Sequence, residues 1–458
     1  MLFSRLESTF ICQYNPDILT KLANFEWFIQ YDKNDNHLYR HHHTEVEECF
    51  GLHKYKYEFF PASGEKGPFR NLLDFHPRKG LDFILKLLNN TAKKYAHSNL
   101  DAKIKSGSYF KIDYSEPLIP QIAIQLNDGS CIIKQYCSER LWIAYRGHSV
   151  APYLLQCALM ALENWLIAYT EISESEDLEW LFDYILRNSN SVMPTAVLAS
   201  VAVGFPEKAG RFVLPLLQIP ELYSIDLHRT IQEMGKYETN WFYAKSNYQN
   251  DPLFEFYAEE RKTAALRPWR KEHLETLVVR LQFSQWREQA LAAIEKLRAS
   301  VSNGETERFL LHRIDSRGWN PVEDKENNRI LFEPKELEPD LKEIQLSVQD
   351  DSQIRSRFTA LLLWAKNTFE RKPLERDYYP TWNDALIETK ALLDQLNNGA
   401  SSELVMFYES IIIAVAVFMR DHSNKLTEED IEWCAEIIFP LIIENADNSL
   451  AITNSMFF

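Results

Sequence analysis

Glycine is scarce in this chain, at 13 of 458 residues, and the sequence lacks the motifs that usually accompany phosphate or acyl chemistry. It contains no GxxxxGK[ST] loop, no GxGxxG, no GxSxG and no HExxH. The nearest string, Ser63–Gly67, has neither the spacing of a phosphate loop nor the Lys-Ser/Thr pair that begins the following helix. These gaps argue against glycine-rich nucleotide loops and β-rich folds. We therefore expect no cofactor and assign no catalytic residue.

Positive charge is also in short supply, because 50 Lys and Arg are outnumbered by 66 Asp and Glu, giving a formal net charge of −16. An acidic chain binds nucleic acid weakly, so such binding would need a local basic patch. Six scattered cysteines without a CxxC pair indicate reduced, buried thiols and a cytoplasmic location. The longest apolar run, Ile411–Met419, is too short to span a bilayer, so we expect no membrane contact.

Three helical patterns follow one another between Ser149 and Leu217. In the first, Leu, Trp and Tyr residues recur on one face, while Gln156, Glu163 and Asn164 are predicted to point away. The second begins near Ser173 or Ser175, and the third ends at Gly204 with a proline just beyond. Short helices of this kind cannot bury their apolar stripes alone, so neighbours must stack. The sequence predicts a mainly α fold, an irregular α-solenoid or helical-repeat array.

One region departs from the helical period. Ile122, Ile124 and Leu126 alternate with smaller or polar neighbours, and Asn127–Ser130 follows with an Asp-Gly pair before a second β-prone run. Asp-Gly between two such runs is typical of a tight β turn. We predict a small β-hairpin insertion near residues 120–136, either a contact device or a decorative loop.

Composition suggests four segments. Residues 1–148 form a mixed α segment that carries the hairpin, and 149–314 form the helical-repeat array. Residues 315–352 are dense in charge and hold three prolines, which predicts a linker or long loop. Residues 353–458 form a C-terminal helical domain. The chain stops at two phenylalanines, which led us to expect that it is a segment of a longer polypeptide.

Two clusters are candidate binding sites. Arg146, His148 and Ser149 come together where a helix is predicted to start, and such a place can hold an anion or contact a partner. Catalysis there would need an oriented base and an oxyanion hole, so capping and packing are the simpler interpretation. The second cluster is basic and aromatic, and its side chains can stack on nucleobases; it comprises Arg267, Trp269, Arg270 and Lys271.

Histidine is concentrated at His41–His43, close to Glu45 and Cys49. Zinc needs about four ligands that converge, and consecutive histidines on a polar stretch do not converge by themselves. We interpret this stretch as a solvated loop and assign no metal ligand; the alternative is a metal or pH-sensitive site, since histidine titrates near neutrality.

Two strings carry a resemblance: YEFFPASGEKGPFRNLLDFHPRKGLDFILKLLN at Tyr57–Asn89, and SVAPYLLQCALMALENWL at Ser149–Leu166 followed by SNSVMPTAVLASVAVGFPEKAG. They resemble the helical region of very large bacterial ATP-binding proteins similar to antiviral STAND-type NTPases, over roughly residues 57–211. These are helix-packing strings, and none of that family's nucleotide-binding residues has a counterpart here. The resemblance implies sensing, scaffolding or oligomerisation, with ATP hydrolysis and any effector elsewhere.

We therefore expect a non-catalytic recognition, scaffold or oligomerisation module of a larger antiphage-defence-like NTPase system, with a protein partner or self-association. One alternative is an enzyme whose site is built from dispersed residues around Arg146 and His148. Another is a nucleic-acid-binding module that uses residues 261–271.

Overall fold

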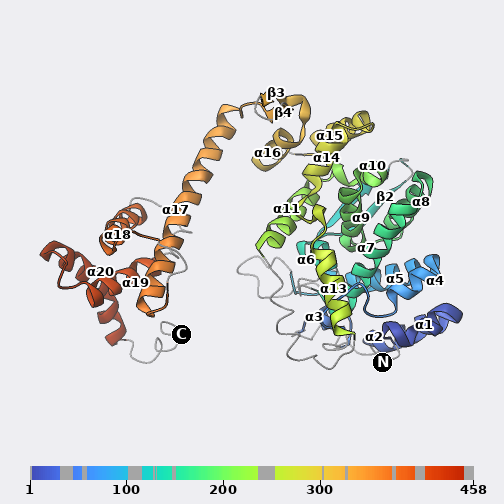
Figure 1. The fold of residues 1–458 in the computed structure, drawn as a ribbon, viewed down its shortest axis with the longest axis horizontal. Coiled ribbons are helices and arrows are strands. Elements are labelled where there is room, and N and C mark those ends of the chain that lie inside the picture. The colour runs from blue at the N-terminus through green and yellow to red at the C-terminus, as the bar shows by residue number, and fades with distance from the viewer. Residues whose placement is uncertain are drawn as a thin grey trace. The chain divides into compact units, whose positions relative to one another are not determined.

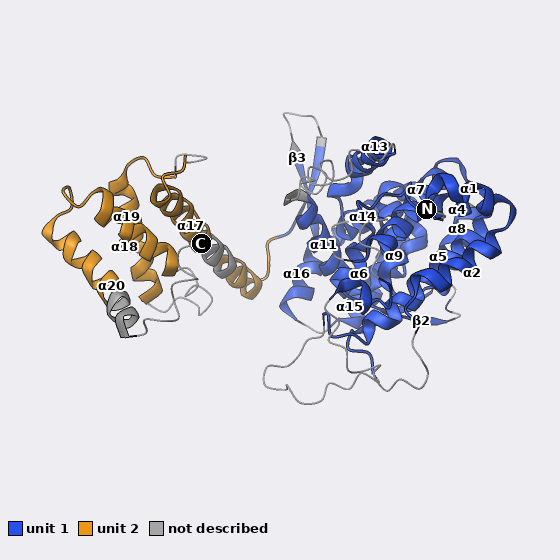
Figure 2. Cartoon of the chain, turned by 90° about the horizontal axis from the view of Figure 1, so that it is seen from below, with its two compact units in different colours: residues 1–335 blue, residues 336–458 orange. Residues whose placement is uncertain are grey.

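The computed structural model describes residues 3–30, 45–53, 59–101, 116–126, 129, 131–146, 151–235, 253–301, 304–324, 329–373, 378–397 and 408–447. Within these ranges the chain is mainly helical, as predicted, and it has two antiparallel β hairpins, of which the sequence predicted one (Figure 1). It divides into two compact units, Met1–Lys335 and Glu336–Phe458 (Figure 2). Each unit has its own cluster of buried apolar side chains.

The first unit contains the following helices: α1 (Arg5–Tyr14), α2 (Pro16–Trp27), α3 (Val46–Cys49), α4 (Phe69–Phe75), α5 (Pro77–Ala96), α6 (Glu139–Ile143), α7 (Tyr153–Ile172), α8 (Ser175–Arg187), α9 (Val192–Gly204), α10 (Pro206–Ala209), α11 (Pro220–Gly235), α13 (Phe254–Ala265), α14 (Leu274–Gln282), α15 (Arg287–Ser300) and α16 (Glu305–Ile314). Its short 3₁₀ turns are η2 (Ala144–Arg146), η3 (Gly210–Val213), η4 (Leu216–Gln218), η5 (Pro268–Lys271) and η6 (Ser316–Gly318). Its strands are β1 (Gln121–Gln125), β2 (Ile132–Tyr136), β3 (Trp319–Asp324) and β4 (Arg329–Pro334).

Helices α7 and α9 form the centre of the first unit. The end of α9 at Gly204 is confirmed, and α8 starts at Ser175, the second of the two predicted positions. The prediction that Gln156 and Glu163 point away from the core is wrong, because they are 0% and 1% exposed. The sequence shows only the apolar stripe of α7, whereas α4, α9 and η2 pack around that helix and cover its polar positions as well.

The hairpin predicted near residues 120–136 is confirmed. β1 and β2 pair antiparallel from Gln121 opposite Tyr136 to Gln125 opposite Ile132. Gly129 in the connection has a φ of +68°, a left-handed conformation that glycine adopts without strain. The hairpin is also joined to the helices, since the Tyr136 N–H donates to the Asn190 carbonyl at 2.8 Å, just before α9.

Residues 315–352 are more regular than the linker that we predicted. They hold η6, the β3–β4 hairpin and the first turns of the next helix, which starts at Pro339. The prolines do not prevent this, because Pro321 and Pro334 lie in a two-stranded hairpin whose strands are both edges, and Pro339 occupies the first helical turn. The division between the two units falls after Lys335, inside this segment. The expected segments 1–148 and 149–314 share one apolar cluster.

The second unit comprises α17 (Pro339–Phe369), α18 (Trp382–Asn397), α19 (Tyr408–Asp421) and α20 (Glu428–Asp447). Phe358, Trp364 and Phe418 lie in its core. A capping box precedes α20, because the Asp430 N–H donates to Thr427 Oγ1 at 3.2 Å and the Thr427 N–H donates back to Asp430 Oδ2 at 3.1 Å. None of the helices that the structure describes is both long enough and apolar enough to cross a membrane.

Candidate functional site

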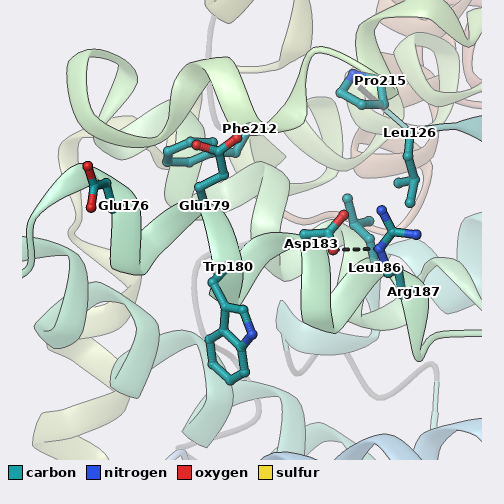
Figure 3. Close-up of a pocket in the computed structure, with 9 residues that line it drawn as sticks. All are labelled: Leu126, Glu176, Glu179, Trp180, Asp183, Leu186, Arg187, Phe212 and Pro215. Atoms are coloured by element: carbon teal, nitrogen blue, oxygen red, sulfur yellow. Dashed lines mark hydrogen bonds and ion pairs between the residues drawn. The ribbon is translucent and has the colours of Figure 1, made fainter. Parts of the chain in front are cut away.

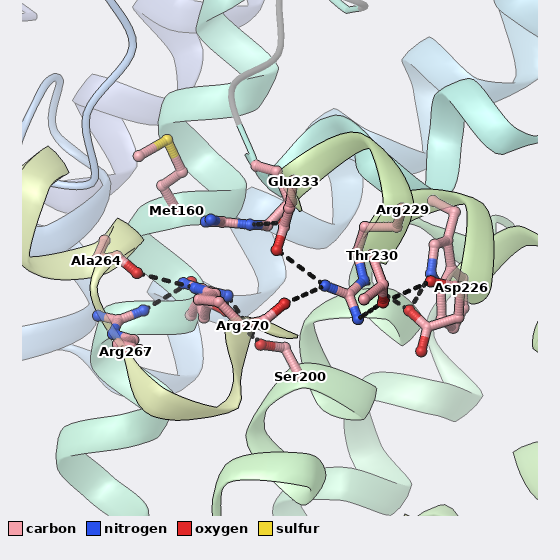
Figure 4. Close-up of polar contacts among 12 residues, drawn as sticks. Met160, Ser200, Asp226, Arg229, Thr230, Glu233, Ala264, Arg267 and Arg270 are labelled. Atoms are coloured by element: carbon pink, nitrogen blue, oxygen red, sulfur yellow. Dashed lines mark hydrogen bonds and ion pairs between the residues drawn. The ribbon is translucent and has the colours of Figure 1, made fainter. Parts of the chain in front are cut away.

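Two segments that lie far apart in the sequence meet inside the first unit. Arg146 ends η2, and Arg267 and Arg270 lie at and within η5. The structure brings these three arginines together with acidic side chains from α7 and α11 (Figure 4). We call this set the arginine network; it comprises Arg146, Glu163, Asp226, Arg229, Glu233, Arg267 and Arg270. His148 and Ser149 fall outside the described residues.

Glu163 accepts four hydrogen bonds at the centre of the network. Arg270 Nη1 donates to its Oε1 at 2.6 Å, and Arg270 Nη2 donates to its Oε2 at 2.5 Å. Arg267 Nη1 adds a contact to Oε2 at 2.8 Å, and the Ser200 hydroxyl donates to Oε1 at 2.6 Å. Two parallel contacts from one guanidinium fix both distance and orientation. η5 is thereby fastened to α7 and α9.

Glu163 and Arg270 each stabilise the charged form of the other. Burial alone would raise the pKa of Glu163, but the adjacent Arg270 and Arg267 outweigh it and hold that pKa far below the ordinary value of 4.5. Burial alone would likewise lower the pKa of Arg270, yet the Glu163 carboxylate raises it. Both groups therefore remain charged in the interior at neutral pH.

α11 supplies the other half of the network. Asp226 accepts from Trp142 Nε1 at 2.9 Å, from Arg229 Nε at 2.7 Å and from the Leu274 N–H at 2.9 Å. These contacts join α11 to α6 and to the start of α14. Glu233 pairs with Arg146, and Arg229 Nη1 donates to it at 3.1 Å. Arg229 also donates to the Glu272 carbonyl at 2.6 Å, directly after η5.

Little free volume remains beside the arginine network. Its four guanidinium groups meet three carboxylates. The cavity beside Tyr145, Ser200 and Arg229 has a volume of about 10 Å³, which is close to the size of one water molecule. The strong donors and acceptors already bind one another. This geometry therefore indicates a structural role for the arginine network.

The predicted basic-aromatic cluster is divided by the fold. The Arg270 side chain is 4% exposed and the Arg267 side chain 14%, and both bind Glu163. Trp269 is half-buried and packs at 5.6 Å, edge to face, against Phe205. Lys271 is the exposed member of the four. The guanidinium groups therefore point into the protein, where they hold the helices together.

A pocket of about 370 Å³ lies along α8. Three acidic residues of α8 line it, Glu176, Glu179 and Asp183, together with Leu126, Trp180, Leu186, Arg187, Phe212 and Pro215 (Figure 3). Asp183 binds Arg187 at 2.5 Å, and Glu179 binds Arg211 at 3.2 Å. Figure 3 shows the Trp180 ring turned away from Phe212 and Pro215. The pocket is thus a mixed groove in which arginine already binds two of the three carboxylates.

A third feature lies on the surface of the first two helices. Large apolar side chains project outward from α1 at Leu6 (67% exposed), Phe10 (70%) and Tyr14 (66%), and from α2 at Ile18 (47%), Leu22 (39%) and Phe25 (73%). We call these six residues the α1–α2 face. The Phe10 and Tyr14 rings lie 4.6 Å apart.

The same two helices also carry an inner apolar stripe. Cys12 of α1 and Leu19, Ala23 and Trp27 of α2 are at most 1% exposed. The outer stripe of α2, which begins two residues after the helix starts at Pro16, was not predicted from the sequence. Its signal was available in the sequence, because Ile18, Leu22 and Phe25 repeat at helical spacing beside the inner set.

In the part of the chain that the structure describes, no group of three or more His, Cys, Asp or Glu side chains is placed to hold a metal ion. His41–His43 lie outside that part. The cysteines are free thiols, and burial raises the pKa of Cys137 to about 12 and of Cys157 to about 11. No protein-family model matches the sequence, and no curated protein matches it.

Proposed function

We propose that the chain is a non-catalytic recognition, scaffold or oligomerisation module that binds another protein chain through the α1–α2 face. The observation that carries this proposal is the exposure of six large apolar side chains on two adjacent helices. At about 200 Å² per aromatic residue, its three aromatic members alone present roughly 400 Å² to solvent. The aliphatic members add to this, and contiguous apolar patches larger than a few hundred Å² mark interaction sites on soluble proteins.

The arginine network supports the non-catalytic part of this proposal. Its buried charged groups are of the kind that catalytic sites use. Here they bind one another and hold α7, α11 and η5 in place. Arg146 pairs with Glu233 at 7% exposure, which does not favour an anion or enzyme site around Arg146 and His148. The burial of Arg267 and Arg270 likewise does not favour nucleic-acid binding by residues 261–271.

The wider setting rests on the sequence resemblance over residues 57–211. We place the module in a cytoplasmic, antiphage-defence-like NTPase system, in which ATP hydrolysis and any effector belong to other parts. We also interpret the packing of α4, α5, α7, α8 and α9 as an irregular helical-repeat array, whose stacked layers present a large outer surface. The free cysteines fit a reducing compartment.

Site-specific photo-crosslinking tests the binding role. A benzoylphenylalanine at position 10 of the full chain, activated in intact cells, should join this face to another polypeptide, identified by mass spectrometry. The same probe at position 180, on α8 and 54% exposed in the natural chain, serves as the control. Absence of any intermolecular product at position 10, or equal products at both positions, would contradict the proposal.

A further inference from the structure

We propose that the occupant of the α1–α2 face is a second copy of this chain, which forms a two-fold symmetric dimer through α1 and α2. This inference rests on the proposed function, because it names the partner of the same face.

Helix α2 is apolar on two sides. The inner stripe of α2, Leu19, Ala23 and Trp27, lies in the core of the first unit. The outer stripe, with Ile18, Leu22 and Phe25, has the spacing of a helix that packs against other helices. α1 buries Ser8 and Cys12 and exposes Leu6, Phe10 and Tyr14. Both helices therefore carry large apolar side chains on their outer side, so a further layer belongs there.

The face is complementary to itself. Burial of apolar surface is non-directional, so a face made of leucine, isoleucine and aromatic side chains matches a copy of itself. A two-fold axis brings the same patch of two copies together, and this is the commonest symmetry of soluble oligomers. Heterologous contacts would require a different matching surface, whereas the isologous contact needs only the six residues present.

The charged residues beside the face permit this contact. Glu7, Lys21 and Glu26 are exposed on the same two helices, so both signs are present at the rim. Asp17 binds Lys79 at 2.8 Å, and Glu7 accepts from the Ser4 hydroxyl at 2.9 Å. Lys21 of one copy can therefore meet an acid of the other, which offsets part of the repulsion between two chains of net charge −16.

The exposed area is of the size that a stable dimer needs. A standard interface buries about 800 Å² on each partner. The three aromatic residues supply roughly half of that, at about 200 Å² for a fully exposed ring. Leu6, Ile18 and Leu22 and the polar rim of α1 and α2 supply further area.

Light scattering coupled to size-exclusion chromatography tests the inference on the full chain. The natural protein should elute at twice its chain mass of 53.8 kDa. Phe10→Ser combined with Phe25→Ser should raise the dissociation constant at least about a hundredfold, because central aromatic residues dominate such interfaces. Trp180→Ser, which removes an exposed aromatic residue of α8, should leave the mass unchanged. Circular dichroism should show both variants folded.

Three results would overturn the inference. The natural chain could remain a monomer across a dilution series, the Phe10 and Phe25 double variant could dimerise as tightly as the natural chain, or Trp180→Ser could dissociate the dimer equally. If the chain is a monomer and its position 10 crosslinks in cells to a different protein, the inference of a dimer is wrong and the proposed function stands. If the chain is a monomer and no intermolecular crosslink forms at that position, both the inference of a dimer and the proposed function are wrong.

Discussion

Glu163 and Arg270 are separated by 107 residues in the sequence and form a two-point ion pair in the interior of the first unit, with N–O distances of 2.6 and 2.5 Å. The Glu163 side chain is 1% exposed and that of Arg270 is 4% exposed. Removing one member of such a pair leaves the other as a buried charge without its counterion. The pair therefore determines how well η5 stays attached to α7.

We expect Glu163→Gln to destabilise the first unit by about 3–5 kcal/mol, because it leaves Arg270 and Arg267 in the interior without a negative charge. Urea unfolding followed by circular dichroism measures this loss. Glu171→Gln on the exposed end of the same helix is the matched control, and it should change stability by less than about 0.5 kcal/mol. Equal effects of the two substitutions would show that the buried pair contributes little.

The contribution of Glu163 should also depend on pH. Its pKa in the folded protein lies below the ordinary value of 4.5, so as the pH falls the unfolded chain takes up this proton first. The stabilisation is therefore complete above about pH 4.5 and is lost as the pH falls toward the folded-state pKa. The difference in unfolding free energy between the natural chain and Glu163→Gln should shrink when measured at successively lower pH below 4.5. A constant difference would contradict this assignment.

Local signals in the sequence predicted local structure well. The Asp-Gly pair identified the β1–β2 hairpin, Gly204 marked the end of α9, and Ser175 was one of the two predicted starts of α8. The arginine network could not be predicted in this way, because the two arginines that bind Glu163 lie more than a hundred residues later in the chain. On a helical projection Glu163 resembles a solvent-facing residue, and only the packing of α9 and η5 makes it central.

Two neighbouring residues of α2 should respond differently to truncation. Leu19 is 0% exposed and lies in the core, so Leu19→Ala should cost about 2–5 kcal/mol of stability. Ile18 is 47% exposed, and Ile18→Ala should cost less than about 1 kcal/mol in the dissociated chain. Thermal unfolding of the two variants in the Phe10 and Phe25 double-serine background measures both. A cost for Ile18→Ala as large as that for Leu19→Ala would mean that the outer stripe is buried within one chain.

We expect the purified full chain to release no phosphate from ATP above the buffer rate. Its nearest approach to a phosphate loop, Ser63–Gly67, instead binds a carboxylate of the chain itself. Glu260 Oε2 accepts from the Ser63 hydroxyl at 2.5 Å and from the Gly64 N–H at 3.0 Å, and Lys66 Nζ donates to the Phe60 carbonyl at 2.8 Å. A phosphate-release assay checks this expectation. Steady turnover that Lys66→Ala abolishes would contradict it.

The central claim is that the α1–α2 face is covered by protein when the module is at work, and hydroxyl-radical footprinting in intact cells tests it most directly. Oxidation of Phe10 and Tyr14 is compared with that of buried Trp27 and exposed Trp180, each relative to its own rate in the unfolded chain. The account predicts that Phe10 and Tyr14 are protected nearly as well as Trp27. Oxidation of Phe10 and Tyr14 as rapid as that of Trp180 would contradict it.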